Sequence, residues 1–231
     1  IINEPAIILD KKSLNDAFRV VFKNSIENDF NSKNLIELIE YDKKHNNYIN
    51  INESLSSLYS TLTGINHKAF CFLLENGFDP NIPDCHGIHL LQYALFLDAY
   101  SFIHSIIQSN KIDIKIKVPI IPYESYRLNN SYDNNKKFEW EKYPSKIVVK
   151  NCTTYLHLAA KCSNSQILKE FLDKKLIDVN VEDDLGNTPL IDACISKRKD
   201  NILQLFKLNN IDYQHCNKEG YDALKIIKPA L

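Results

Sequence analysis

Two stretches near the N-terminus, residues 13–30 and 33–45, place apolar residues at helical spacing. The apolar positions are Leu14, Ala17, Phe18, Val21 and Phe22 in the first stretch and Leu35, Ile36, Leu38 and Ile39 in the second. Ser13 stands where a helix cap is expected. The pattern therefore predicts two helices within residues 13–50.

Further along, the pattern repeats itself. Residues 153–184 and 187–218 align with an offset of 34 residues, so that Leu156 matches Leu190 and Ala159 matches Ala193. Residues 86–117 and 53–84 form looser copies, and the chain ends inside a fifth copy. Each copy has a turn, a short helix, a polar break and a second helix. Such helix pairs cannot bury their apolar faces alone, so we expect the copies to stack.

The stretch GNTPLIDACI, residues 186–195, shows how a copy begins. Gly186 suits a left-handed turn, and Thr188 can cap the helix that follows. Pro189 at the first helical position loses no hydrogen bond, and its fixed φ favours a helix start. The small side chain of Ala193 allows paired helices to approach closely. The proline therefore marks the start of a helix.

These residues resemble the ankyrin-repeat family, whose pattern is roughly D-x-x-G-x-T-P-L-H-x-A-A, then a second helix and G-A-D-x-N. The matching residues are Asp183, Gly186, Thr188, Pro189, Leu190 and Ala193 in one copy, Thr154, Leu156, His157, Ala159 and Ala160 in the copy before it, and Leu73, Leu74, Gly77, Asp79 and Asn81 further upstream. The resemblance implies an all-α solenoid of stacked helix–turn–helix units. It also implies that His157 bonds back to Thr154 and onward to the neighbouring turn. Where Gln92, Ile191 and Lys225 occupy the same position, that link should be weaker or replaced.

The repeat boundaries suggest a domain organisation. We assign residues 1–52 to an N-terminal segment with a degenerate capping repeat, 53–117 to two ankyrin repeats, 118–150 to an aromatic-rich insertion, and 151–231 to two ankyrin repeats and a truncated C-terminal capping repeat. The insertion contains the only Trp and several Tyr residues, and its pattern predicts a hairpin-like projection. Two readings stay open: the insertion contacts a partner, or its aromatic rings pack back onto the repeats.

Composition and charge exclude several classes of function. Lys plus Arg total 28 and Asp plus Glu total 29, so the chain lacks the basic field that nucleic-acid binding usually needs. No apolar run approaches the length of a membrane span, and the N-terminus does not read as a signal peptide. The scattered cysteines favour reduced thiols and a cytoplasmic location. The absence of Met and the Ile-Ile start favour a piece of a longer protein.

The sequence offers little evidence of a catalytic, metal-binding or phosphate-binding site. Cys85, His86 and His89 lack further zinc ligands at suitable spacing. Cys152 and His157 have the residue types of a nucleophile pair, but the repeat pattern explains His157 better. We find no phosphate-binding glycine motif. The sequence therefore predicts no catalysis, no cofactor and no metal.

The resemblance implies that a protein partner binds the concave groove formed by first-helix ends and turn tips. The predicted partner-binding residues are Phe96, Leu97, Lys161, Ile195 and Ser196 at helix ends, His86, Ile88, Leu185 and Asn187 at turn tips, and Tyr126 and Trp140 in the insertion. We expect a monomeric protein-interaction module.

The alternative is a targeting domain of a larger enzyme, or a secreted microbial effector that engages host proteins in the host cytoplasm. Weaker alternatives are a catalytic pocket of its own and self-assembly through the C-terminal end.

Overall fold

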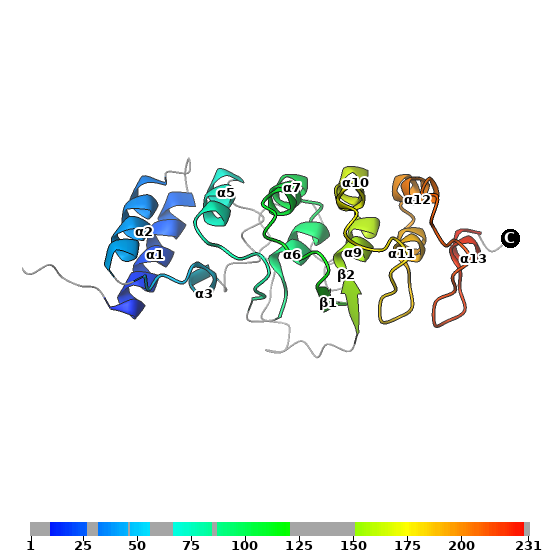
Figure 1. Cartoon of the computed structure of the whole chain (residues 1–231), viewed down its shortest axis with the longest axis horizontal. Coiled ribbons are helices and arrows are strands. Elements are labelled where there is room, and N and C mark those ends of the chain that lie inside the picture. The colour runs from blue at the N-terminus through cyan, green and yellow to red at the C-terminus, as the bar shows by residue number, and fades with distance from the viewer. Residues whose placement is uncertain are drawn as a thin grey trace, which may run out of the picture. The chain divides into compact units, whose positions relative to one another are not determined.

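The structure, a computed structural model, describes residues 10–26, 32–45, 47–55, 67–84, 87–120 and 151–228. Within these ranges the regular structure is helical, apart from one sheet of two short strands (Figure 1). The all-α fold predicted from the sequence is confirmed. The chain divides into two compact units, Ile1–Asp79 and Pro80–Leu231. This division falls inside the segment 53–117, and the domain boundaries assigned from the sequence stay predictions.

The N-terminal unit contains α1 (Lys11–Ile26), α2 (Lys33–His45), α3 (Ile51–Leu55) and α5 (His67–Glu75). Helix α1 packs against α2 and α3 and buries Leu14, Phe18 and Phe22, as the apolar pattern predicts. The predicted cap at Ser13 is wrong, because α1 begins earlier. Asp10 Oδ1 accepts the backbone N–H of Ser13 at 2.7 Å and so caps the helix.

The C-terminal unit is built from helix pairs. They are α6 (Leu90–Phe96) with α7 (Tyr100–Gln108), α9 (Tyr155–Lys161) with α10 (Ser165–Lys174), and α11 (Pro189–Ile195) with α12 (Lys199–Phe206), followed by α13 (Ala223–Ile227). The first helices α6, α9 and α11 lie in one row, and the second helices α7, α10 and α12 lie in another (Figure 1). Consecutive helices of each row contact one another, and α13 packs on α11.

Equivalent positions of the three first helices form the core of this unit. The second residue of each is a buried Leu, and the fifth is a fully buried Ala. These residues are Leu91, Leu156 and Leu190, and Ala94, Ala159 and Ala193. Burying one Leu side chain contributes about 1.5–3 kcal/mol. The predicted equivalence of Leu156 and Leu190 is confirmed.

The turns before the first helices are closed by the same hydrogen bonds. In the turn 183–187, Asp183 N–H donates to Asn187 O at 2.9 Å, and Asn187 N–H donates to Asp183 Oδ1 at 2.8 Å. The turns 84–88 and 217–221 repeat both bonds. Gly186 has the predicted left-handed conformation, with φ 74°. Neighbouring turns are joined by Lys218 N–H, which donates to Leu185 O at 3.1 Å.

Two paired strands lie at the two ends of the predicted insertion, residues 118–150. Strand β1 (Lys117–Pro119) pairs antiparallel with β2 (Cys152–Thr154), with Val118 opposite Thr153. Ile120 N–H extends the pairing by donating to Asn151 O at 2.8 Å. This pairing matches the base of a hairpin-like insertion. Residues 121–150 lie outside the described part of the chain.

His157 joins two consecutive repeats, as the resemblance implies. Its Nδ1 lies 2.8 Å from Thr154 Oγ1 and its Nε2 lies 2.8 Å from Asn187 O. The Asn187 carbonyl can only accept, so Nε2 carries the proton and Thr154 donates to Nδ1. Burial lowers the pKa of His157 and keeps the ring neutral.

Two of the other repeats replace this histidine link by different bonds. Gln92 Nε2 donates to Pro119 O at 3.0 Å, so a glutamine reaches forward in place of the imidazole. Ile191 is apolar and buried. The corresponding link is made instead by Asn217 Nδ2, which donates to Asn187 Oδ1 at 2.9 Å. The expectation that these positions weaken or replace the link is confirmed for Gln92 and Ile191.

We predict that Gly186→Ala destabilises the protein more than Gly87→Ala. Both glycines have positive φ, which costs an alanine about 1–2 kcal/mol. A Cβ at Gly186 would also lie 3.0 Å from Lys218 N, whereas a Cβ at Gly87 meets nothing within 4 Å. Urea unfolding followed by circular dichroism measures both variants. If both variants lose the same free energy of unfolding, the close approach between neighbouring turns does not contribute to stability.

We predict that His157→Gln reduces the loss of stability on acidification. A histidine whose folded pKa is lowered stabilises the fold above its unfolded pKa, about 6.5, and this stability is lost as pH falls through the folded value. Between about pH 7.5 and pH 5.5, wild type should therefore lose more stability than the variant. His45→Gln, at an exposed position, is the control. An unchanged pH dependence in His157→Gln would contradict a buried neutral imidazole.

Candidate protein-binding surface

The ends of the first helices present a row of six residues, two from each of α6, α9 and α11. We call them the helix-end row: Phe96, Leu97, Lys161, Cys162, Ile195 and Ser196. Leu97 is 52% exposed and Ile195 is 51% exposed, although both are large and apolar. Phe96, Lys161 and Ser196 are half-buried, and Cys162 is buried. The five row residues predicted to bind a partner are thus accessible to different degrees.

A left-handed residue after α6 and α11 keeps the preceding residue on the surface. Asp98, with φ 50°, follows Leu97, and Lys197, with φ 55°, follows Ser196. The chain then turns back, because Ala99 N–H donates to Ala94 O at 2.9 Å. Arg198 makes the same bond to Ala193. These turns close the helix ends as C-caps do.

Helix α9 ends differently, and this difference buries its cysteine. Cys162 adopts an extended conformation, with φ −62° and ψ 149°. Its thiol donates to Leu95 O at 3.3 Å and Leu158 O at 3.4 Å. Burial, followed by the nearby Asp98 carboxylate, raises the pKa of the Cys162 thiol well above its usual range. A thiol of this kind is a poor nucleophile.

The next repeat satisfies the free carbonyl groups at the end of α9. Arg198 Nε donates to Lys161 O at 2.7 Å. Asn201 Nδ2, on α12, lies 2.9 Å from both Ala160 O and Cys162 O, and the Asn201 side chain is buried. Terminal helix carbonyls need such partners when they are buried. These hydrogen bonds were not predicted from the sequence, in which Asn201 follows the charged residues 197–200 and precedes an apolar stretch.

Lys161 pairs with a buried carboxylate of the next repeat. Its Nζ lies 2.7 Å from Asp192 Oδ2, and the Asp192 side chain is only 2% exposed. Burial raises the pKa of Asp192, and the ammonium of Lys161 opposes that shift. Lys161 therefore neutralises Asp192 within the protein, so its charge is already partnered. This pair was not identified from the sequence.

His157, Asp183 and Asp192 bring ligand-type atoms within 4.8 Å of one another, close enough to share a metal ion. Both His157 nitrogens already have hydrogen-bond partners. Asp183 Oδ1 accepts from Leu185 N and Asn187 N, and Lys161 supplies the cation for Asp192. The cluster is better described as a polar tie between repeats than as a metal-binding centre.

The structure corrects two of the predicted turn-tip residues. Ile88 is fully buried and Asn187 is 5% exposed, so neither is available at the surface. Both close their turns through their backbone, which directs the chain into the first helix beside the core. The Asn187 amide is also used, since it donates to Asp192 and accepts from Asn217. Leu185, in contrast, is 41% exposed at its tip.

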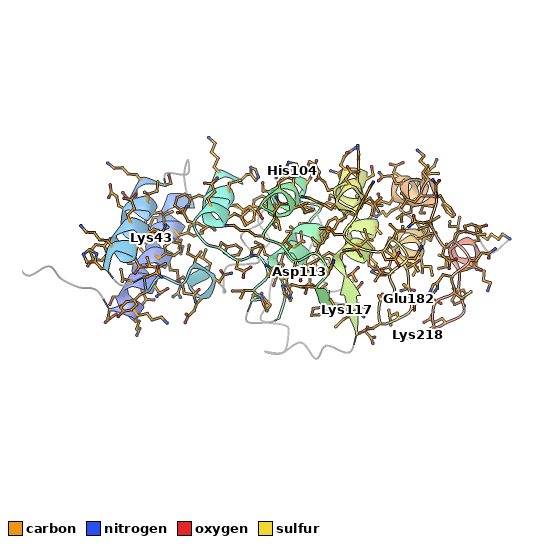
Figure 2. The ribbon with its side chains drawn as sticks, in the orientation of Figure 1. Lys43, His104, Asp113, Lys117, Glu182 and Lys218 are labelled. Atoms are coloured by element: carbon orange, nitrogen blue, oxygen red, sulfur yellow. The ribbon has the colours of Figure 1, made fainter. Side chains whose placement is uncertain are left out.

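Three other predicted contacts, His86, Tyr126 and Trp140, lie outside the described residues and stay predictions. In the described part, Figure 2 shows Lys117, Glu182 and Lys218 near the turns of the C-terminal unit, with His104 on the opposite side on α7. There Glu170 Oε1 lies 2.9 Å from both Tyr100 OH and His104 Nδ1. This contact joins α7 to α10 on the side away from the turns.

A small cavity of about 110 Å³ adjoins the helix-end row. Its lining includes Phe96, Lys161, Cys162, Ser163 and Arg198. Asp98 also lines it, but both oxygens of its carboxylate accept from Ser163 N–H, at 2.9 and 3.1 Å. The row thus combines exposed apolar side chains with a recess of about the size of one side chain.

None of the helices in the described ranges is both long enough and apolar enough to span a membrane.

Comparisons with known proteins agree with the repeat architecture. The family described as ankyrin repeats (3 copies) matches residues 130–219. None of the curated proteins matches the chain. The solved structure of the predatory endopeptidase Bd0816 from Bdellovibrio bacteriovorus in complex with immunity protein Bd3460 contains a similar chain. The alignment has a TM-score of 0.57 and 19% identity, and it covers 94% of this chain and 90% of that chain.

At this level of identity the structural likeness concerns the fold alone. The family match includes both complete repeats after the insertion, 153–184 and 187–218. In these repeats the helix pairs stack with equivalent buried Leu and Ala residues and with the predicted His157 link. Residues 130–219 therefore match the ankyrin-repeat family, and the stacked helix pairs of the C-terminal unit agree with that match.

Proposed function

We propose that this protein is a recognition module that binds a protein partner through the helix-end row, with Leu97 and Ile195 as its main contacts. The observation that carries the proposal is their exposure at the ends of equivalent helices. Single exposed apolar residues are common on protein surfaces. Here, however, two occur where the same helix-end turn recurs, and Phe96 and a small cavity lie beside one of them.

The surroundings of these two residues suit recognition. The helix ends are fixed by backbone bonds and by Arg198 and Asn201, so little conformational entropy is lost on binding. Lys161 and Ser196 of the row and the exposed Leu185 of a turn tip belong to the proposed contact surface. Partner surfaces commonly combine an apolar centre with polar residues around it. The turn tip at His86 and the aromatic residues Tyr126 and Trp140 of the insertion belong to the same proposal.

Ankyrin repeats are generally binding modules without catalysis, and we propose the same for this chain. The buried thiol of Cys162 and the engaged nitrogens of His157 support a structural role for both residues. We propose a monomer in the cytoplasm that uses no cofactor.

A second candidate function is that of a targeting domain of a larger enzyme, or of a secreted effector that acts on host proteins. The similar solved chain belongs to a complex between an endopeptidase and an immunity protein, so this fold does occur in such an assembly. A reading frame that continues beyond Leu231 into a catalytic domain would favour this candidate.

We predict that Leu97→Glu and Ile195→Glu each weaken partner binding by about tenfold or more, because a charge would replace a buried apolar contact. The partner is first captured from the source cells by photo-crosslinking at position 97, and its affinity is then measured by calorimetry. Leu203→Glu is the matched control, since Leu203 is 49% exposed but lies on the second helix α12. Equal effects of all three variants would contradict binding by the helix-end row.

We predict that deleting residues 120–146 weakens binding of the same partner, because the proposal includes contacts from the aromatic residues of the insertion. The strands at its base pair with each other, so a short Gly-Ser link should preserve them. Circular dichroism checks the fold, and calorimetry measures the affinity. Unchanged affinity would restrict the binding surface to the helix-end row and the turn tips.

A further inference from the structure

A cavity of about 570 Å³ opens within the N-terminal unit, and nothing in the proposed function uses it. Its walls come from the start of α1, the end of α2, the segment 47–51 and the turn after α5. The lining includes Lys11, Ile39, Lys43, Tyr48, Ile51 and Asn76. This volume lies within the usual range of sites for small molecules.

One wall of the cavity is held in place by a buried carboxylate. Asp42 is 3% exposed, and its two oxygens accept from Tyr48 N–H at 2.7 Å and Ile49 N–H at 2.9 Å. Asn15 on α1 adds two bonds, from its Nδ2 to Tyr48 O at 3.0 Å and from Asn50 N–H to its Oδ1 at 2.9 Å. The segment is therefore fixed before any ligand arrives, which lowers the entropic cost of binding.

The charge around the cavity is positive. Lys11 and Lys43 reach it from different helices, and Lys43 is labelled on α2 in Figure 2. Neither ammonium has an ion-pair or hydrogen-bond partner among the described residues. The negative charge of Asp42 is engaged by two backbone N–H groups, and the carboxylate of Asp10 caps α1.

The rest of the lining is partly apolar. Ile39 and Ile51 are each 6% exposed, while the Tyr48 side chain is 41% exposed. The cavity thus combines an aliphatic wall and an accessible ring with two ammonium groups that have no ion-pair partner in the described part of the chain. Such a combination suits a ligand that carries an anionic group on an apolar body.

We infer that this cavity binds a small organic phosphate. A phosphate monoester carries a charge of about −1.5 to −2 at pH 7. The lining has two ammonium groups, of Lys11 and Lys43, and one carboxylate, of Asp42, so it offsets part of that charge. A Lys ammonium binds phosphate and carboxylate oxygens alike, as a point charge. Phosphate is favoured by its larger charge, since a carboxylate carries only one negative charge for the two ammonium groups. The ring of Tyr48 and the two Ile side chains then contact the organic part.

Calorimetry of the full chain with phenyl phosphate tests this inference, with inorganic phosphate and benzoate as comparison ligands. Phenyl phosphate should bind with at least about threefold higher affinity than either, since it alone uses both the charges and the apolar wall. Tyr48→Ala should weaken binding of phenyl phosphate and leave inorganic phosphate unchanged. The Tyr48 contact to Asp42 uses backbone atoms, so this variant keeps the wall intact.

Matched lysine variants separate the site from the general charge of the unit. Lys11→Ala and Lys43→Ala should each weaken phenyl phosphate binding by about five- to tenfold. Lys12→Ala and Lys44→Ala change the net charge equally, but neither residue lines the cavity, so both should bind as wild type does. Circular dichroism confirms the fold, and Lys11→Gln or Lys43→Gln replaces any alanine variant that unfolds.

Three results would overturn the inference. The first is the absence of saturable phenyl phosphate binding by the folded protein. The second is an equal effect of all four lysine variants, which would indicate a diffuse electrostatic attraction. The third is binding of benzoate or inorganic phosphate as tight as that of phenyl phosphate. That result would show that the cavity does not prefer a small organic phosphate.

Discussion

Every other feature of the C-terminal unit depends on the packing of each first helix against the next first helix. A Leu at the second position and an Ala at the fifth position bury the contact, and the small Ala side chains permit close approach. The apolar burial supplies most of the stabilising free energy. Hydrogen bonds and an ion pair between repeats, here called polar ties, then fix which groups face each other. His157, Asn201 and the Lys161–Asp192 pair each cross from one repeat to the next.

These polar ties have a consequence for recognition. A buried carbonyl or carboxylate without a partner costs about 1–3 kcal/mol or more, so each tie penalises relative movement of two repeats. The helix ends are thereby held in fixed positions, including those that expose Leu97 and Ile195. Rigid apolar contacts of this kind suit the recognition role proposed for the helix-end row.

Much of the fold follows from the sequence because local chemistry marks the repeat boundaries. Gly186 reads as a left-handed turn, Thr188 and Pro189 read as a helix start, and the resemblance to the ankyrin-repeat family implies the bond between Thr154 and His157. These features are local or recur with the repeat offset. The wrong cap at Ser13 shows the limit, because Asp10 is an equally good cap three residues earlier.

The candidate site was less predictable because it depends on side-chain direction and on partners from other repeats. The pattern locates the turn that contains Ile88 but does not reveal that the side chain faces the core. Lys161 looks like a free surface cation until Asp192, 31 residues away, is placed beside it. The cavity of the N-terminal unit combines four separate segments, and spacing along the chain does not indicate their convergence.

Native-state hydrogen exchange of the full chain, read residue by residue, tests the packing of consecutive first helices most directly. If that packing stabilises the C-terminal unit, amide protons on α9 and α11 will exchange with the same opening free energy. The amides to compare are those of Ala159 and Ala160 on α9 and of Ala193 and Cys194 on α11. Leu190→Ala should lower protection on both helices together. Fast exchange of α11 while α9 stays protected, or an effect of Leu190→Ala confined to α11, would contradict the account.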